Sequence, residues 1–319
     1  MSDPSDLLAL MERSGLVEEY HHGAVAVADS TGRVVASFGD VDRQFFLRSS
    51  AKPFQAYTAL EAGVSLPDTH LALACASHSG DPVHVAIVED ILARHGLDVG
   101  ALACPPARPV PSADRRLAAA GTRSPQTRFH NCSGKHAAML AACVVSGWDL
   151  ASYTSPHHPL QRRVESLMVE TTGVDLGPPG VDGCGVPTWR TTTAGLARAF
   201  ALLEVDPRFE RIRTVMGRYP LLISGEDRPD ALIGRWLGAA AKGGAAGCLG
   251  IALAGHGIGV KSWSGSGVIA GVGAGVGLGR LGVVVGAVQA ALVDVFSPPV
   301  LGGGSEVGRI RSDAVLESV

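Results

Sequence analysis

A serine and a lysine stand three residues apart in Arg48-Ser49-Ser50-Ala51-Lys52, directly ahead of apolar residues with helical spacing. Residues three apart share one face of a helix, so we expect Ser49 and Lys52 to lie side by side. A serine hydroxyl becomes a nucleophile when a base takes its proton, and lysine serves as that base once burial or nearby positive charge lowers its pKa. Because this spacing is frequent by chance, the alternative is a capping serine beside a solvated lysine.

Two more hydroxyls and an imidazole follow in Ala76-Ser77-His78-Ser79-Gly80-Asp81, after the apolar run LALACA. We interpret the run as a buried strand that ends in this turn, and functional residues gather where strands end. The alternative is a turn whose serines cap the helix that begins near Pro82. The segment alone favours that alternative.

Thiols and nitrogens gather in a third segment, where helical spacing puts Cys132, Lys135 and His136 on one face. A further cysteine, Cys184, lies in a glycine-flanked loop with Asp182. Two thiolates with a nitrogen ligand suit a soft cation such as zinc. There is no Cys-x-x-Cys pair, so buried structural thiols are the alternative, and spacing alone favours it.

A fourth segment, Lys242-Gly243-Gly244, precedes a run of small residues and is expected to form an edge strand that faces a pocket. A lysine there would place positive charge next to the nucleophile. Residues 277–282 match G-x-G-x-x-G formally, but they do not lie in a βαβ unit, so we expect no dinucleotide site.

The elements that must position these residues are a hairpin, a set of helices and a late group of strands. Residues 22–38 predict a β-hairpin, and glycine-punctuated apolar runs from Lys242 onward predict successive strands in the same sheet. Helical spacing and end signals predict the helices, at residues 53–62, 83–95, 133–146, 158–173 and 191–204. The pattern indicates an α+β fold, with helices packed on a mostly antiparallel sheet.

Composition narrows the classes of function. The 319 residues carry a net charge of -3 without runs of like charge, which argues against nucleic acid or an anionic membrane as partner and leaves a small molecule. The N-terminus lacks the features of a secretory signal, so we expect a cytoplasmic protein whose six cysteines are reduced. No window of 18 uninterrupted apolar residues occurs between residues 243 and 296, and we expect no transmembrane helix.

Seven ordered blocks between about residues 20 and 262 resemble the L-asparaginase II family of the Rhizobium etli type. The blocks are RSSAKPFQA, CASHSG, HNCSGKHAAML, HHPLQ, DGCGVPT, YPLLISGEDRPD and AKGGAAG. The family is similar in fold to glutaminases and serine β-lactamases. The resemblance implies one catalytic domain over residues 1–319, with or without a helical subdomain around 53–180, and a homodimer.

The resemblance also implies an activity and a site. It implies hydrolysis of L-asparagine through an acyl-enzyme, with Ser49 and Lys52 as one pair. Ser79 would pair with a distant lysine, which we place at Lys242, with Lys261 as the less favoured candidate. The implied zinc ligands are Cys132, Lys135 and Cys184, and the implied substrate-orienting residues are Arg48, His136 and Asp182.

Two departures from the family pattern leave other functions open. The element usually reading K-T-G-A-E-G has Gly243 and Ala246 here, which removes a hydroxyl and a carboxylate. Further on, Lys261-Ser262-Trp263-Ser264-Gly265 lacks the acidic residue typical after its lysine. The alternatives are a glutaminase, a penicillin-binding type of acyl transferase, or a degenerate, non-catalytic homologue that binds metal.

Overall fold

The computed structural model describes residues 6–110, 124–175 and 177–319. Within them, nine strands form one sheet in which every pairing is antiparallel. The path runs β11-β12-β1-β2-β10-β9-β8, while β3 pairs with β2 and β13 with β3. The strands are β1 (Leu7–Arg13), β2 (Leu16–Ala28), β3 (Val34–Phe38), β8 (Ala240–Gly244), β9 (Cys248–Leu253), β10 (His256–Ser262), β11 (Pro299–Gly302), β12 (Ser305–Arg311) and β13 (Glu317–Ser318). The predicted α+β fold with an antiparallel sheet is confirmed.

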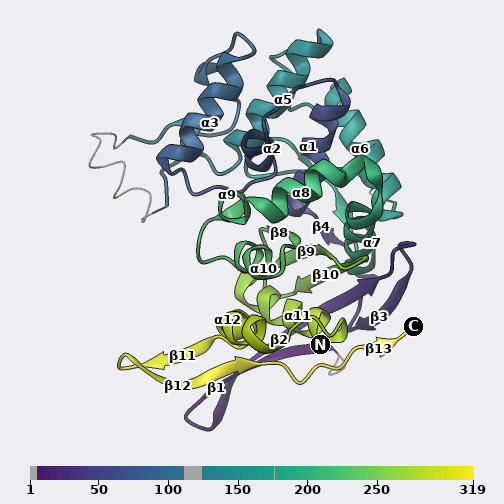
Figure 1. The fold of residues 1–319 in the computed structure, drawn as a ribbon, viewed down its shortest axis with the longest axis vertical. Helices are drawn as coiled ribbons and strands as arrows, with labels where there is room; N and C mark the ends of the chain where they lie inside the picture. The colour runs from purple at the N-terminus through teal and green to yellow at the C-terminus, as the bar shows by residue number, and fades with distance from the viewer. Residues whose placement is uncertain (1–5, 111–123, 176) are drawn as a thin grey trace.

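Helices lie on both faces of this sheet (Figure 1). They are α1 (Lys52–Glu61), α2 (Asp68–Ala74), α3 (Pro82–Ala93), α5 (Ser133–Ser146), α6 (Pro159–Thr172), α7 (Thr193–Val205), α8 (Glu210–Arg218), α9 (Pro220–Ser224), α10 (Pro229–Leu237), α11 (Gly267–Arg280) and α12 (Gly286–Phe296). Two small ribbons pair β4 (Phe45–Phe46) with β7 (Arg190–Thr191), and β5 (Gly180–Val181) with β6 (Pro187–Thr188). In the described part of the chain no helix has the length and apolar character needed to cross a membrane.

Glycines in the strands let helix α7 lie directly on the sheet. A Cβ at Gly257 would sit 2.1 Å from the backbone oxygen of Ala197, and one at Gly250 would enter the ring of Phe200. The many glycines of the chain therefore serve close approach of backbone to helix as well as turns.

The opposite face is covered by α11, which corrects the prediction that the strands continue through residues 267–273. Glycines 273 and 277 face the sheet, because a Cβ there would lie 2.7 Å from Val260 and 2.6 Å from Ile258. Glycine has a low helix propensity, so the local sequence did not indicate a helix here. The close contact with the sheet that glycine allows stabilises the helix nonetheless. The G-x-G-x-x-G match falls at the end of this helix.

Helices α1, α2 and α5 pack together above α7 and carry most of the candidate site (Figure 1). The rings of Phe54, Phe200 and Phe209 meet edge to face in their shared core. The run LALACA belongs to helix α2 and its C-cap, so the predicted buried strand is wrong. A fully apolar run has no periodicity to separate the two structures. The hairpin 22–38 and the helices predicted at 53–62 and 133–146 are confirmed.

Candidate active site

Lys52 is the first residue of α1 and is completely buried. Its Nζ lies 2.5 Å from the carbonyl oxygen of Ala76, 3.0 Å from Ser77 Oγ and 3.3 Å from the carbonyl oxygen of Asn131. The turn after α2 supplies two of these partners, and the segment before α5 supplies the third. No carboxylate is among them.

The protonation of Lys52 follows from these surroundings. Burial lowers its pKa to about 8, with Cys132 opposing the shift and the charges of Lys135 and Lys242 adding to it. The two carbonyl oxygens can only accept hydrogen bonds, so a neutral amine donates its two hydrogens to them and keeps its lone pair for the Ser77 hydroxyl. Lys52 is therefore arranged as a base toward Ser77.

Ser77, which the sequence did not single out, is the serine that contacts a lysine. It is 5% exposed, and its backbone N–H donates to the carbonyl oxygen of Ile223 at the end of α9. Ser79 is half-buried; its hydroxyl donates to Asp81 and lies 3.4 Å from His84 Nδ1. Ser77 is buried and Ser79 is half-buried, and spacing in the sequence cannot show which of the two serines lies inward.

Ser49 lies one turn before Lys52, in the short 3-10 helix Arg48–Ala51, and is half-buried. Its backbone oxygen accepts a hydrogen bond from the N–H of Lys52. Arg48 has φ of 51°, a left-handed conformation that residues other than glycine adopt at a cost, so the turn that presents Ser49 is held by its surroundings.

Lys242 lies on edge strand β8 and is completely buried. Its Nζ pairs with Asp230 Oδ2 at 3.2 Å and donates to the carbonyl oxygen of Gly243 at 2.7 Å. Among the described residues, no hydrogen bond joins it to Ser79. The less favoured candidate, Lys261, donates to the carbonyl oxygens of Ala246 and Ser262 on the far side of the β8–β9 turn.

The lysines share one further property. The chain contains four of them, Lys52, Lys135, Lys242 and Lys261, against 27 lysines and arginines together, and all four are at most 6% exposed. Arginine cannot be deprotonated in proteins, whereas a buried lysine can. Lysine therefore occurs only where an amine can act in the interior.

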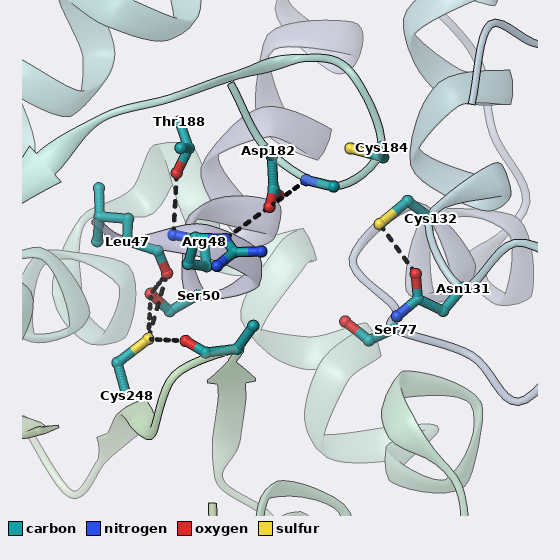
Figure 2. A network of polar contacts seen from close by, with 12 residues as sticks. Leu47, Arg48, Ser50, Ser77, Asn131, Cys132, Asp182, Cys184, Thr188 and Cys248 are labelled. Carbon is teal, nitrogen blue, oxygen red and sulfur yellow. Dashed lines mark hydrogen bonds and ion pairs between the residues drawn. The ribbon is translucent and has the colours of Figure 1, made fainter. Parts of the chain in front are cut away.

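The two predicted thiols and Lys135 come together. Lys135 Nζ lies 3.1 Å from Cys184 Sγ, and Cys132 Sγ contacts Asn131 Oδ1 at 3.3 Å. The hydrogen bond between the Cys132 and Cys184 side chains lowers the pKa of Cys132 and raises the pKa of Cys184. Figure 2 shows Cys184 on its loop and Cys132 on the facing segment at one side of the site.

Arg48 and Asp182 form an ion pair at the same site, with Nε 2.6 Å from Oδ1 (Figure 2). The backbone N–H of Arg48 donates to Thr188 Oγ1 at 3.1 Å. Asp182 also accepts from the N–H of Gly183, which ties the Cys184 loop to Arg48. The ion pair uses only Nε, and among the described residues no hydrogen bond uses the two terminal nitrogens, so they can bind an anion.

Two buried histidines stay neutral. His136 Nδ1 lies 2.6 Å from the hydroxyl of Tyr153, and burial lowers the pKa of His136 well below its usual value. His78 accepts from the N–H of Gly80 at Nδ1 and lies 2.9 Å from Ser133 Oγ at Nε2. Its tautomer is thereby fixed, so it holds the turn rather than moving protons.

A cavity of about 620 Å³ is lined by Ser77, Ser79, Asn131, Ser224 and Arg228 among others, whereas Arg48, Ser49 and Asp182 are not among its lining residues. A second hollow of about 490 Å³ lies beside α11 on the other side of the sheet, and it contains no lysine. The chemistry of its walls makes the first cavity the candidate active site.

An antiparallel α+β fold with a buried lysine on a serine hydroxyl defines a protein suited to acyl transfer. The L-asparaginase II family model matches residues 9–312, and the chain belongs to that family.

Two solved structures are similar to the chain. "Crystal Structure Analysis of Mglu in its native form" is 18% identical, covers 85% of this chain and 63% of that one, and has a TM-score of 0.41. The same protein in the presence of 4.3 M NaCl is 18% identical, covers 75% and 55%, and has a TM-score of 0.33. The chain thus spans less than two thirds of either structure. No curated protein matches it.

Proposed function

We propose that the chain hydrolyses the side-chain amide of L-asparagine to L-aspartate and ammonia through a serine ester. The observation that carries the proposal is the contact between Lys52 Nζ and Ser77 Oγ, 3.0 Å apart and away from solvent. A lysine buried without a carboxylate is a base near neutral pH, which amide hydrolysis by serine requires.

In the proposed reaction Ser49 is the nucleophile. Its Oγ bonds to the amide carbon, and its proton passes through the Ser77 hydroxyl to Lys52 Nζ. Lys52 then gives the proton to the leaving nitrogen as the carbon–nitrogen bond breaks, and ammonia departs. Water attacks the ester along the same proton route, which releases aspartate and restores Ser49. In this proposal Ser77, 3.0 Å from Lys52 Nζ, carries the proton, whereas the resemblance implied Ser79 beside a distant lysine.

The substrate's charged groups would be held by Arg48 and Asp182. The terminal nitrogens of Arg48 suit the α-carboxylate, and the carboxylate of Asp182, 2.6 Å from Arg48 Nε, suits the α-ammonium group. His136 is fully buried against Tyr153, so its proposed part is to support the start of α5.

We also propose that Cys132, Lys135 and Cys184 hold zinc. Two thiols and an amine, all at most 4% exposed, converge from two segments, and this donor set fits a soft cation. Bound there, zinc would fix the Cys184 loop against α5 and so the position of Asp182. Among the described residues no group of three His, Cys, Asp or Glu side chains offers another metal site.

Ammonia release from asparagine, glutamine and β-aspartyl compounds tests the function. We expect release from asparagine to fall at least about 100-fold in Ser49→Ala and Ser77→Ala, and little in the control Ser305→Ala, at an exposed serine of β12. Preference for glutamine would favour the glutaminase alternative. If ammonia is released from none of these compounds, the non-catalytic alternative would be favoured. Equal rates in wild type and Ser49→Ala would remove the nucleophile. The proposed homodimer is tested separately by light scattering.

A further inference from the structure

Asp230, near the start of α10, makes three contacts at the bottom of the site. Its Oδ2 lies 3.2 Å from Lys242 Nζ and accepts the backbone N–H of Gly243 at 2.8 Å. Its Oδ1 accepts the N–H of Ala231 at 3.2 Å. The side chains of Asp230 and Lys242 are 2% and 0% exposed. A charge this deeply buried stays charged only when its partner does.

The absence of a side chain at residue 243 makes room for this carboxylate. A Cβ on Gly243 would lie 3.2 Å from Asp230 Oδ2, closer than a relaxed contact, so a larger residue would push the carboxylate aside. Gly243 is one of the two positions where the chain departs from K-T-G-A-E-G. The lost hydroxyl is thus accompanied by a close contact between strand β8 and Asp230.

Burial lowers the pKa of Lys242 below its usual value, and the charge of Arg228 lowers it further. Asp230 and, to a smaller extent, Cys132 oppose that shift. In turn Lys242 lowers the pKa of Lys52. Lys242 also acts on the buried thiols of Cys75 and Cys248.

We propose that Asp230 is a positioning residue that holds Lys242 as a permanent ammonium ion, so that Lys242 supplies fixed positive charge beside the Ser77–Lys52 pair and takes no part in proton transfer. The two buried lysines of the site then have opposite states: one is paired with a carboxylate and charged, and the other has only neutral partners and is a base. This inference rests on the proposed function for its catalytic meaning.

Lysine side-chain NMR tests the charge directly, because a ¹⁵N-lysine sample contains four labelled side chains. Lys242→Arg assigns the Lys242 signal. We expect that signal to stay in the ammonium range from pH 6 to 9 in wild type, and to titrate at least about one pH unit lower in Asp230→Asn. Gly243→Ala, which displaces the carboxylate without removing it, should give a smaller shift in the same direction.

Two variants guard against a folding defect. The pair Asp230→Leu with Lys242→Met removes both charges together and so leaves neither one unpaired. If charge is what matters, this folded double variant should lose at least about tenfold in kcat with little change in KM. Full activity in the double variant would overturn the inference.

A neutral Lys242 in wild type at pH 7, or an unchanged titration in Asp230→Asn, would also overturn it. Neither NMR result depends on turnover, so the NMR measurement would still determine the charge of Lys242 if the protein proved not to hydrolyse asparagine. Conversely, a wild type that hydrolyses asparagine with a neutral Lys242 sinks only the inference.

Discussion

The amine of Lys52 lies 3.0 Å from the hydroxyl of Ser77, twenty-five residues away along the chain, and both groups are buried. The contact joins the start of α1 to the turn after α2. It relates the Ser49–Lys52 motif to a hydroxyl outside that motif.

Replacing Lys52 should separate charge from proton transfer. Lys52→Arg keeps a positive charge but stays protonated at all working pH values, so we expect activity to fall at least about 100-fold. Ammonia release at saturating asparagine measures the loss. Arg33→Lys, on the exposed turn between β2 and β3, is the control and should leave the rate unchanged. Near-normal activity in Lys52→Arg would show that the base is another group.

The pH profile should report the same lysine. Because the neutral form is the base and burial lowers the pKa of Lys52 to about 8, kcat/KM should rise with pH and reach half its maximum at about pH 8. Measured rates between pH 6 and 10 check this. A profile that is flat across that range would contradict a titrating base.

Metal binding should depend on the two converging thiols and not on burial of a thiol as such. Cys132→Ser and Cys184→Ser should each lower zinc content, measured by mass spectrometry of the purified protein, by at least about tenfold. Cys104→Ser, at another buried thiol, is the matched control and should retain the metal. Equal zinc in all three would place the metal elsewhere.

Stability in acid should depend on Asp230. Burial would raise its pKa, but Lys242 and Arg228 lower it to about 2, from 3.8 in the unfolded chain. Because the pKa of Asp230 is lower in the folded protein than in the unfolded chain, its ionised carboxylate stabilises the folded state above pH 4. This contribution of about 2 kcal/mol is lost as the pH falls from 4 toward 2. Asp230→Asn should lower the free energy of unfolding by about 3 to 5 kcal/mol at pH 7, with a smaller deficit at pH 3.

Urea unfolding at both pH values measures that difference. Asp294→Asn, whose side chain is 65% exposed beside Arg309, is the control and should change the free energy by less than about 0.5 kcal/mol. The same effect at Asp294 as at Asp230 would refute the special position of the buried pair.

Two glycines of α11 should respond in opposite directions. Gly279 has open space where a Cβ would stand, so Gly279→Ala should stabilise the protein by about 0.5 to 1 kcal/mol. In Gly277→Ala the new Cβ would lie 2.6 Å from Ile258, and we expect a loss of about 1 to 3 kcal/mol. Thermal unfolding of the two variants, which carry the same substitution in one helix, compares packing with propensity.

Local patterns predicted much of this fold because they agreed with the tertiary structure. The hairpin over 22–38 and the helix at 133–146 have the periodicity of their elements. Helix α11 was not predicted because its glycines are needed for close packing against strands β10 and β2, and the local sequence does not show those contacts. LALACA is buried on every side in α2, so no polar face marks its period.

Spacing in the sequence relates residues of the site only where one segment holds both partners. Ser49 and Lys52 share a turn, and Cys132 and Lys135 share another. Ser77 and Asp230 owe their roles to contacts with Lys52 and Lys242 across the fold. The block YPLLISGEDRPD contains Asp230 but does not say which of its four acidic or basic residues turns inward.

Because every lysine is buried, the reactivity of the lysine amines reports local unfolding of the chain. Acylating reagents that modify surface lysines in most proteins should leave the ε-amines of this folded chain untouched, since none is more than 6% exposed. Each ε-amine becomes reactive only when its own segment opens, so the order in which the four are acylated would trace how the chain unfolds.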